Sequence, residues 1–435
     1  MSPVVLVLVS AVVVLVLLEF DSSWLQAHTL AGIARSMQFS LAQGPSSAIH
    51  YPHRGPYDYR LGYASLPKFA GRLEASGYEI AKQAHDSNSY MLLTGLGLYP
   101  MYREKNQAGL QILDGSDHPI YTVHYPARIY SNASEIPPLL ANTLLFIENR
   151  NLLDAKHPYL NPAVEWGRLS RAVVQYAVHQ VDRGVPRIGG STLATQLEKI
   201  RHSPRGKTHS ADEKFWQMAS ASLRAYRDGP ETLTTRRDIL CDYINSIPLA
   251  APPKQGEVTG LGDGLWIWYG ADFDTVNHLL RAPERSLDRR DQQQQARVYR
   301  EALSLFLAMR APDYYLVQSP ESLSRQTARY LRVLRAGGII SSRLCDLALR
   351  LSAPLHPQVR SRAVGGFVAN KVPDLVRAQL LSQLGLDDVE ALDHLDLMVR
   401  TTIDGKVEHD VTHFLRQLTS TDKMEGLQQY TRAHK

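Results

Sequence analysis

Apolar positions recur at helical spacing through most of the chain from Ser134 onward, which predicts a mainly α-helical protein. The segment from Ser134 to Arg150 starts with two prolines and is then apolar almost all round, as expected of a buried helix. Further helices are expected over residues 161–178, 211–226, 236–247, 301–309, 320–336, 341–351 and 372–384. Residues 281–300 are rich in charge and typical of a solvated helix face.

The region before this helical part has a different pattern. Alternating residues over Gly109–Asp114 and Ile120–His124, separated by a short polar turn, predict a β-hairpin. A helix is expected over 22–37 and another over 71–84, with a loop rich in Pro, Gly and Tyr over 44–66. We therefore expect residues 25–133 to form a small α+β module, whose function the pattern does not indicate.

Residues 3–18 are almost wholly Val and Leu. This run is slightly shorter than the ~20 residues that span a bilayer, yet Phe20 and Trp24 can extend it towards the interface. A secretory signal peptide is the alternative, although no basic segment precedes the run and no clean cleavage site follows it. The favoured interpretation is a retained transmembrane signal anchor over residues 1–24.

The amino-acid composition excludes few classes of protein. A chain of 435 residues with 44% apolar residues is expected to contain two or three units and a sizeable core. Its net charge of +5 suits an anionic membrane surface or a phosphate-bearing ligand, and nothing in the sequence supports nucleic-acid binding. Cys241 and Cys345 lie in apolar helical patterns, which predicts buried thiols and neither a disulfide framework nor a zinc site.

The stretch with the clearest candidate chemistry is Gly189–Lys199, which reads G-G-S-T-L-A-T-Q-L-E-K. Two glycines followed by Ser191 and Thr192 at the start of a helix provide free N–H groups and hydroxyls, an arrangement that favours anions. Gln196 and Lys199 follow on one helix face. Taken alone, such a turn is more often a plain helix cap than a binding site.

Two glutamates flank this stretch. Glu148 stands at the far end of the buried helix, where a carboxylate is either part of a structural salt bridge or a functional group. Glu213 falls in the first turn of the helix expected over 211–226, where favourable placement against the helix dipole is the simpler explanation. Together with the glycine turn, the two carboxylates indicate acid/base chemistry on a sugar phosphate.

These elements, in this order, resemble the family 51 glycosyltransferases, the peptidoglycan transglycosylases that occur alone or as the first half of bifunctional penicillin-binding proteins. The similarity covers roughly Ile136 to Arg350 and rests on successive motifs. They are I-P-P-x-L…E-N-R, the G-G-S-T-L-A-T-Q-L-E-K block, the glutamate at 213, R-R-D-I-L-C-D-Y-I-N, and G-L-G-D-G-L-W-I-W-Y-G with the later A-P-D-Y-Y.

The resemblance implies a lysozyme-like transglycosylase domain with head and jaw lobes, here over residues 134–350. The tail, 351–435, is similar to the linker that precedes a transpeptidase domain, and that domain is absent. The implied reaction is inverting transfer from a glycan on undecaprenyl pyrophosphate to lipid II. The implied location is the bacterial inner membrane, with a single span and the catalytic domain on the periplasmic side. A transpeptidase is an expected partner, and no cofactor is required, with a divalent cation such as Mg²⁺ or Mn²⁺ left open.

The resemblance also assigns roles residue by residue. Glu148 is the general base that takes the proton from the acceptor hydroxyl, and Glu213 assists on the donor side, next to the pyrophosphate or a bound cation. The residues expected to bind substrate are Arg150, Ser191, Thr192, Gln196, Lys199, Arg236 and Arg329.

This chain departs from the family pattern at several positions. Asn149 stands where the first motif has aspartate, Leu152 replaces its phenylalanine, and His209-Ser210 replaces an Arg-Lys pair whose function we expect in Arg205 or Lys207. These departures leave open a membrane-tethered scaffold that binds lipid-linked precursors and has little or no activity. A lysozyme-like hydrolase is a second alternative, because paired carboxylates also cleave glycosidic bonds.

Overall fold

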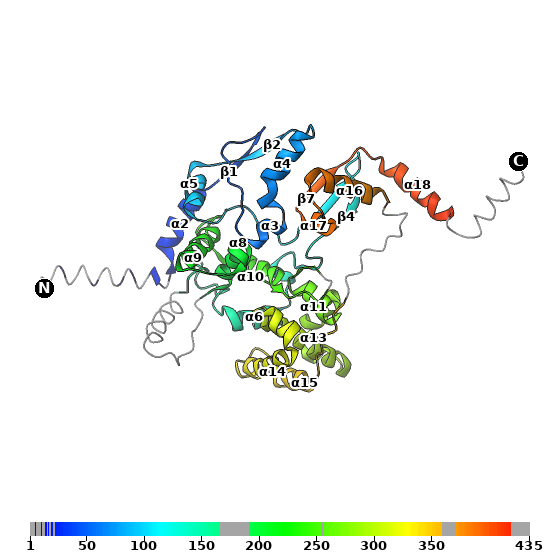
Figure 1. The fold of residues 1–435 in the computed structure, drawn as a ribbon. Coiled ribbons are helices and arrows are strands. Elements are labelled where there is room, and N and C mark those ends of the chain that lie inside the picture. Colours follow the sequence, from blue (N-terminus) through cyan, green and yellow to red (C-terminus); the bar gives the residue numbers. More distant parts are fainter. Residues whose placement is uncertain are drawn as a thin grey trace, which may run out of the picture. The chain divides into compact units, whose positions relative to one another are not determined.

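A computed structural model describes residues 22–165, 191–253, 256–358 and 371–418, together with a few residues before position 22. Contacts divide the chain into two compact units (Figure 1). The first comprises residues 1–58, 81–106 and 128–359, and the second comprises 59–80, 107–127 and 360–435. Each unit draws on separate stretches of sequence, so the predicted 25–133 module is shared between them.

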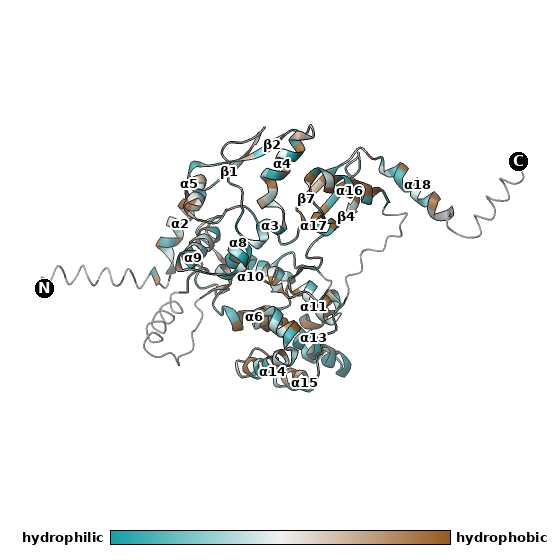
Figure 2. Ribbon diagram, in the orientation of Figure 1, coloured by the Kyte–Doolittle hydropathy of each residue, from teal (hydrophilic) through white to brown (hydrophobic). Residues whose placement is uncertain are grey.

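The first unit is mainly helical. Its helices in the region predicted to be catalytic are α6 (Pro138–Glu148), α8 (Leu193–His202), α9 (Ala211–Ala225), α10 (Leu233–Ser246), α11 (Leu261–Tyr269), α12 (Phe273–Arg281), α13 (Arg289–Ala308), α14 (Pro320–Ala336) and α15 (Ser342–Arg350). A short antiparallel pair, β5 (Pro248–Leu249) with β6 (Val258–Thr259), separates α10 from α11. Figure 2 shows hydrophobic and hydrophilic positions along the same helices, as expected of elements that pack on one face only.

Helix α13 lies at the centre of the main hydrophobic core. Every residue from Val298 to Ala308 is buried, because α11, α12, α14 and α15 all pack against this helix. Leu140 and Leu144 of α6 and Ile244 of α10 belong to the same core. Burial of each such side chain contributes roughly 1.5–3 kcal/mol. The core therefore fixes the ends of α6 and α13, which approach each other at the candidate site.

The beginning of the described chain also belongs to the first unit. Helix α2 (Trp24–Ser36) packs against α9, with Ala27, Ala31 and Ala34 buried. Strands β1 (Phe39–Gln43) and β2 (Lys82–Asp86) pair antiparallel, and α5 (Asn88–Leu96) follows. Helix α3 (Pro56–Arg60) lies between β1 and β2 in the sequence and contains the boundary between residues 58 and 59 that divides the two units.

The second unit is built around a small mixed sheet. Strand β3 (Leu110–Leu113) pairs antiparallel with β4 (Pro119–Thr122) and parallel with β7 (Leu397–Arg400). Helices α4 (Leu66–Ala75), α16 (Lys371–Leu384) and α17 (Val389–His394) bury Phe69, Leu384 and Leu392 against Leu110 and Ile112. Helix α18 (Gly405–Leu418) follows the last strand. The tail predicted to be linker-like thus supplies a strand and helices to this unit.

Several element predictions are confirmed and some are wrong. The hairpin and the helices near 22–37, 211–226, 236–247, 320–336, 341–351 and 372–384 are present, and both cysteines are free and buried. The helix predicted over 71–84 is wrong, because it ends at Ala75 and β2 begins at Lys82. Residues 289–308, which fall in two segments predicted separately over 281–300 and 301–309, form one helix. The part predicted to be a solvated face contains buried residues, among them Gln292, Gln295 and Tyr299.

Two predicted segments fall outside the described residues. They are the helix over 161–178, described only to residue 165, and the apolar run over 3–18, of which a few isolated positions are described. Across the ranges that the structure describes, no helix combines the length and the apolar character needed to cross a bilayer.

Candidate active site

The candidate base, Glu148, is the last residue of α6. Prolines before and at the start of this helix set its first turn, and the buried Leu140, Leu144 and Leu145 fix it in the core. The side chain of Glu148 is only 11% exposed. The predicted buried helix with a carboxylate at its far end is therefore confirmed.

The carboxylate of Glu148 is held from two elements that are distant in sequence. Gln196 of α8 donates from Nε2 to Oε2 of Glu148 at 3.1 Å, and Arg310, just after α13, donates to Oε1 at 2.9 Å. The hydroxyl of Tyr243 donates to Oε1 of Gln196 at 2.8 Å, which leaves the amide nitrogen of Gln196 turned towards the carboxylate. Tyr330 receives a second hydrogen bond from Arg310 at 3.1 Å. We call Glu148, Gln196, Tyr243, Arg310 and Tyr330 the Glu148 cluster.

Charge in this cluster is set by burial and by the carboxylate. Burial opposes the charge of Arg310, yet its hydrogen bond to Glu148 raises the pKa of the guanidinium, which stays cationic. Burial, reinforced by the negative charge of Glu148, raises the pKa of Tyr243 well above its ordinary value. Tyr243 is therefore a neutral donor, and Arg310 is the charged one.

Asn149 ties the end of α6 to the start of α8. Its side chain is buried, and Oδ1 accepts from the backbone N–H of Leu193 at 3.2 Å while Nδ2 donates to Glu165. The first N–H groups of a helix have no partner within the helix, so this contact satisfies one of them. An amide can both accept and donate, whereas an aspartate could not donate to Glu165. The departure at Asn149 therefore has a structural explanation.

A second group of polar side chains surrounds the start of α8. Lys214 of α9 donates from Nζ to Oγ of Ser191 at 3.0 Å. Burial, followed by the positive charge of Lys199, lowers the pKa of Lys214 to about 8. Burial also lowers the pKa of Lys199, against the opposing effect of Glu148. We call Ser191, Lys199 and Lys214 the cationic turn. Ser191 and Lys214 meet at the N-terminus of α8, which favours an anion, and Lys199 adds a partly buried cation from the last turn of the same helix.

The other predicted residues of this stretch have mainly local contacts. Thr192 is the buried N-cap of α8 and forms a reciprocal capping pair with Thr195, so the capping alternative is confirmed for this residue. Glu213 accepts a hydrogen bond from the backbone N–H of His209 at 2.6 Å, and Ser210 caps the same helix end. Gly189 and Gly190 lie outside the described residues.

The hydrogen bonds of the arginines predicted to bind substrate are made with groups other than the Glu148 carboxylate. Arg150 folds back on its own helix, where it contacts the carbonyl and the ring of Phe146. Arg236 is fully buried and donates to three backbone carbonyls of the loop after α6, those of Leu152, Asp154 and His157. Arg329 is exposed on α14. Among the predicted residues, the structure brings Gln196 and Lys199 close to Glu148, whereas Ser191 contacts Lys214.

Tyr243, Arg310 and Lys214 were not among the residues predicted from the sequence. Arg310 carries a sequence signal, because it is a cation between the apolar end of α13 and the A-P-D-Y-Y segment. Lys214 directly follows Glu213. Arg205 and Lys207, expected to replace the missing Arg-Lys pair, are exposed, and Lys214 is the cation that reaches Ser191.

The opposite face of α8 carries a buried ionic network. Glu104 accepts from Arg201 and His202 and pairs with Arg224 at 3.0 Å. Burial opposes charge on His202, but the adjacent carboxylates of Glu104 and Asp58 outweigh it and raise the pKa of His202 to about 9. No pattern in the sequence indicated this network, since its members come from distant segments.

The segments that the structure describes contain no group of three or more His, Cys, Asp or Glu side chains that could hold a metal ion. The candidate site combines a hydrogen-bonded carboxylate with partly buried cations, which suits removal of a proton beside an anionic group.

Comparison with known proteins agrees with this chemistry. A family model described as Transglycosylase matches residues 116–335, just over half of the chain. The chain belongs to this transglycosylase family, and it is an enzyme, a peptidoglycan glycosyltransferase. No curated protein matches the chain closely enough to be named as a relative. The mainly helical first unit is consistent with the lysozyme-like domain that the resemblance implied.

Proposed function

We propose that this enzyme polymerises lipid II into glycan strands by inverting transfer. In this reaction the acceptor's sugar hydroxyl attacks the anomeric carbon of the donor, a new C–O bond forms, and the bond to undecaprenyl pyrophosphate breaks. The proton of the acceptor hydroxyl passes to the carboxylate of Glu148. The single observation that carries the proposal is the position of this carboxylate, held by Gln196 and Arg310 beside the cationic turn.

The hydrogen bonds to Glu148 support its role as the base. A general base must be fixed within reach of the proton that it takes, and contributes typically 10²–10⁴-fold to the rate. Gln196 and Arg310 each bind a different oxygen of the carboxylate, which restricts its rotation. Because both contacts are made from the side chains of other elements, Glu148 is oriented before substrate binds.

The cationic turn supports a role in holding the leaving pyrophosphate. Negative charge grows on the pyrophosphate as the bond to the sugar breaks, and cations in a partly buried site stabilise such charge strongly. Burial and the positive charge of Lys199 lower the pKa of Lys214, so a bound anion would favour the charged form of this lysine. In this proposal Ser191 and Lys214 take the place of the Arg-Lys pair of the family motif. Glu213 orders the start of α9, and the reaction does not depend on a bound cation there.

The proposal extends to location and partners. A lipid-linked substrate requires the site to lie at a membrane surface, so we propose attachment by the apolar residues 3–18 to the bacterial inner membrane, with the catalytic unit on the periplasmic side. We propose a transpeptidase as a partner that cross-links the product. The nascent glycan strand is both product and donor.

The proposed activity can be tested with the detergent-purified protein and labelled lipid II. We expect polymeric glycan, with one undecaprenyl pyrophosphate released for each bond formed. If lipid II stays monomeric while preformed glycan is cut to fragments with new reducing ends, the enzyme is a hydrolase and the proposal is wrong. If the protein binds lipid II yet neither extends nor cuts glycan, the assignment of a polymerase also fails.

A further inference from the structure

The side-chain amide of Gln196 lies between Tyr243 and Glu148. Its Oε1 accepts from the hydroxyl of Tyr243 at 2.8 Å, and its Nε2 donates to Oε2 of Glu148 at 3.1 Å. Within the described segments no hydrogen bond joins Tyr243 to Glu148 directly. The tyrosine therefore reaches the carboxylate through this amide.

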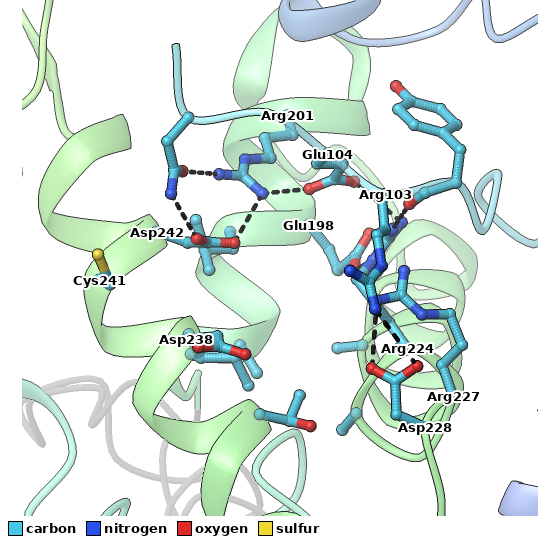
Figure 3. Close-up of a pocket in the computed structure, with 18 of the residues that line it drawn as sticks. Arg103, Glu104, Glu198, Arg201, Arg224, Arg227, Asp228, Asp238, Cys241 and Asp242 are labelled. Atoms are coloured by element: carbon cyan, nitrogen blue, oxygen red, sulfur yellow. Dashed lines mark hydrogen bonds and ion pairs between the residues drawn. The ribbon is translucent and has the colours of Figure 1, made fainter. Parts of the chain in front are cut away.

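The two helices that meet at this amide are also held together elsewhere. Gln196 belongs to α8 and Tyr243 to α10. On another face of α8, Arg201 donates to Oγ of Ser246 at 2.9 Å, and Figure 3 shows its contact with Asp242, the residue before Tyr243. Because Ser246 and Asp242 both belong to α10, these contacts fix the two backbones relative to each other. Only the amide of Gln196 is left to be oriented.

This amide needs a partner that determines which of its ends faces the carboxylate. The oxygen and nitrogen ends of a glutamine amide are alike in shape, and the torsion that carries them has a broad range. If Oε1 of Gln196 faced Glu148, two acceptors would lie opposite each other without a proton between them. A donor at the other end of the amide prevents this arrangement, because it binds the oxygen.

Tyr243 is well suited to be that donor. Its side chain is fully buried in the main core, so its own position is fixed by packing. Burial and the negative charge of Glu148 raise the pKa of Tyr243 well above its ordinary value, so the hydroxyl keeps its proton. Met309 offers a second acceptor, but its Sγ lies at 3.4 Å and a thioether accepts only weakly. The proton is therefore directed to Gln196.

We propose that Tyr243 is a positioning residue for the transferase reaction, which orients the Glu148 carboxylate through the amide of Gln196. The inference rests on the proposed function, because it takes Glu148 as the base. A base that is held in place lowers the barrier of the chemical step. Tyr243 has no exposed surface that could touch lipid II. Its contribution is therefore to kcat and not to KM.

The first test uses the full-length protein in detergent and removes one hydroxyl from each of two buried tyrosines. Tyr299→Phe is the matched control for Tyr243→Phe, because Tyr299 lies equally buried in the same core, with its hydroxyl 2.8 Å from Thr143 of α6. We expect Tyr243→Phe to lower kcat about 3- to 10-fold with KM for lipid II within about twofold of the parent. Tyr299→Phe should leave both constants within about twofold. Equal kcat in the two variants, whether lowered or not, overturns the proposal.

A double-mutant cycle tests whether the effect passes through Gln196. Gln196→Met has nearly the same length and lacks the amide, so it cannot relay the hydrogen bond from Tyr243. When Gln196→Met is already present, adding Tyr243→Phe should change kcat by less than about twofold. If Tyr243→Phe causes its full loss in that background as well, Tyr243 acts by another route and the proposal is wrong.

Unfolding of the same proteins in denaturant verifies that each is folded and needs no lipid II. The losses of unfolding free energy caused by Tyr243→Phe and Gln196→Met should not add, because both substitutions break the same hydrogen bond. Tyr299→Phe and Gln196→Met share no contact and should add. Additive losses for Tyr243→Phe and Gln196→Met would contradict the hydrogen bond on which the proposal depends.

The outcomes separate this proposal from the proposed function. If the parent makes no polymer from lipid II, the proposed function fails and the positioning role of Tyr243 fails with it. If the parent makes polymer and Tyr243→Phe has the kcat of Tyr299→Phe, only the positioning role is wrong.

Discussion

The guanidinium of Arg310 lies 2.9 Å from Oε1 of Glu148, although the two residues are 162 positions apart in the chain. The contact joins the end of α6 to the segment after α13, two ends that the same core fixes. Because Arg310 also donates to Tyr330, its position is set from two sides. We infer that Arg310 is a positioning residue for the proposed base.

Substitution of Arg310 should slow the reaction with little effect on substrate affinity. Arg310→Ala removes the hydrogen bond to Oε1 that helps to orient the Glu148 carboxylate, and misplacement of a catalytic group costs about 10- to 100-fold. We expect Arg310→Ala to lower kcat by that factor, with KM for lipid II changed less than about threefold, and Arg310→Lys to recover part of the loss. Arg329→Ala, on the exposed side of α14, is the matched control. A change confined to KM would instead indicate that Arg310 binds substrate.

Activity should depend on pH through Lys214. The pKa of this lysine is lowered to about 8 by burial and by Lys199, so its charge is present below pH 8 and is lost as the pH rises through that value. If Lys214 holds the pyrophosphate, kcat/KM for lipid II should fall above about pH 8. Lys214→Arg keeps its charge throughout and should show no such fall. An identical alkaline fall in both proteins would exclude Lys214 as its cause.

Exchange of Asn149 for the aspartate of the family motif should destabilise the protein. The new carboxylate would face Glu165 in a buried place and lose the hydrogen bond from Nδ2. We expect Asn149→Asp to lower the free energy of unfolding by roughly 1–3 kcal/mol in denaturant titrations. The double variant Asn149→Asp/Glu165→Gln restores one donor and should recover most of the loss. Additive losses in the double variant would contradict the explanation given for Asn149.

Arg236 should prove to be structural. Its three hydrogen bonds to backbone carbonyls hold the loop that follows α6, and none of them is made with a residue of the Glu148 cluster. Arg236→Met leaves these carbonyls without a donor and should cost roughly 2–4 kcal/mol of unfolding free energy. The fraction that remains folded should bind lipid II as the parent does. If Arg236→Met is as stable as the parent and binds lipid II more weakly, Arg236 is a substrate-binding residue and the structural assignment is wrong.

Much of this fold could be predicted because its helices carry clear local signals. The prolines before Leu139 and the apolar run up to Glu148 specify α6, and alternation specifies the β3–β4 hairpin. The length of α13 could not be predicted, because its first half is highly charged and only the helices around it bury the second half. The parallel pairing of β3 with β7 joins segments that lie far apart in the sequence, and no local pattern encodes it.

Part of the candidate site could also be predicted, because some of its residues stand in local sequence motifs. Glu148, Gln196 and Lys199 stand in continuous motifs and come together as expected, and Ser191, from the same motif, contacts Lys214. Arg310 and Tyr243 were missed because their importance arises from packing between distant helices. Arg236 and Arg150 stand in motifs as well, yet their side chains are used by nearby backbone and ring contacts. Residue type and order therefore located the site but did not identify every member.

The most direct test of the account is the rate of Glu148→Gln measured together with its affinity for lipid II. Glutamine has nearly the same shape and cannot take a proton, and Glu321→Gln, on the exposed start of α14, is the control. We predict that Glu148→Gln loses about 10²–10⁴-fold in kcat while its Kd for lipid II stays within about threefold of the parent value. A folded Glu148→Gln protein that polymerises lipid II at a rate close to the parent's would contradict the assignment of Glu148 as the base.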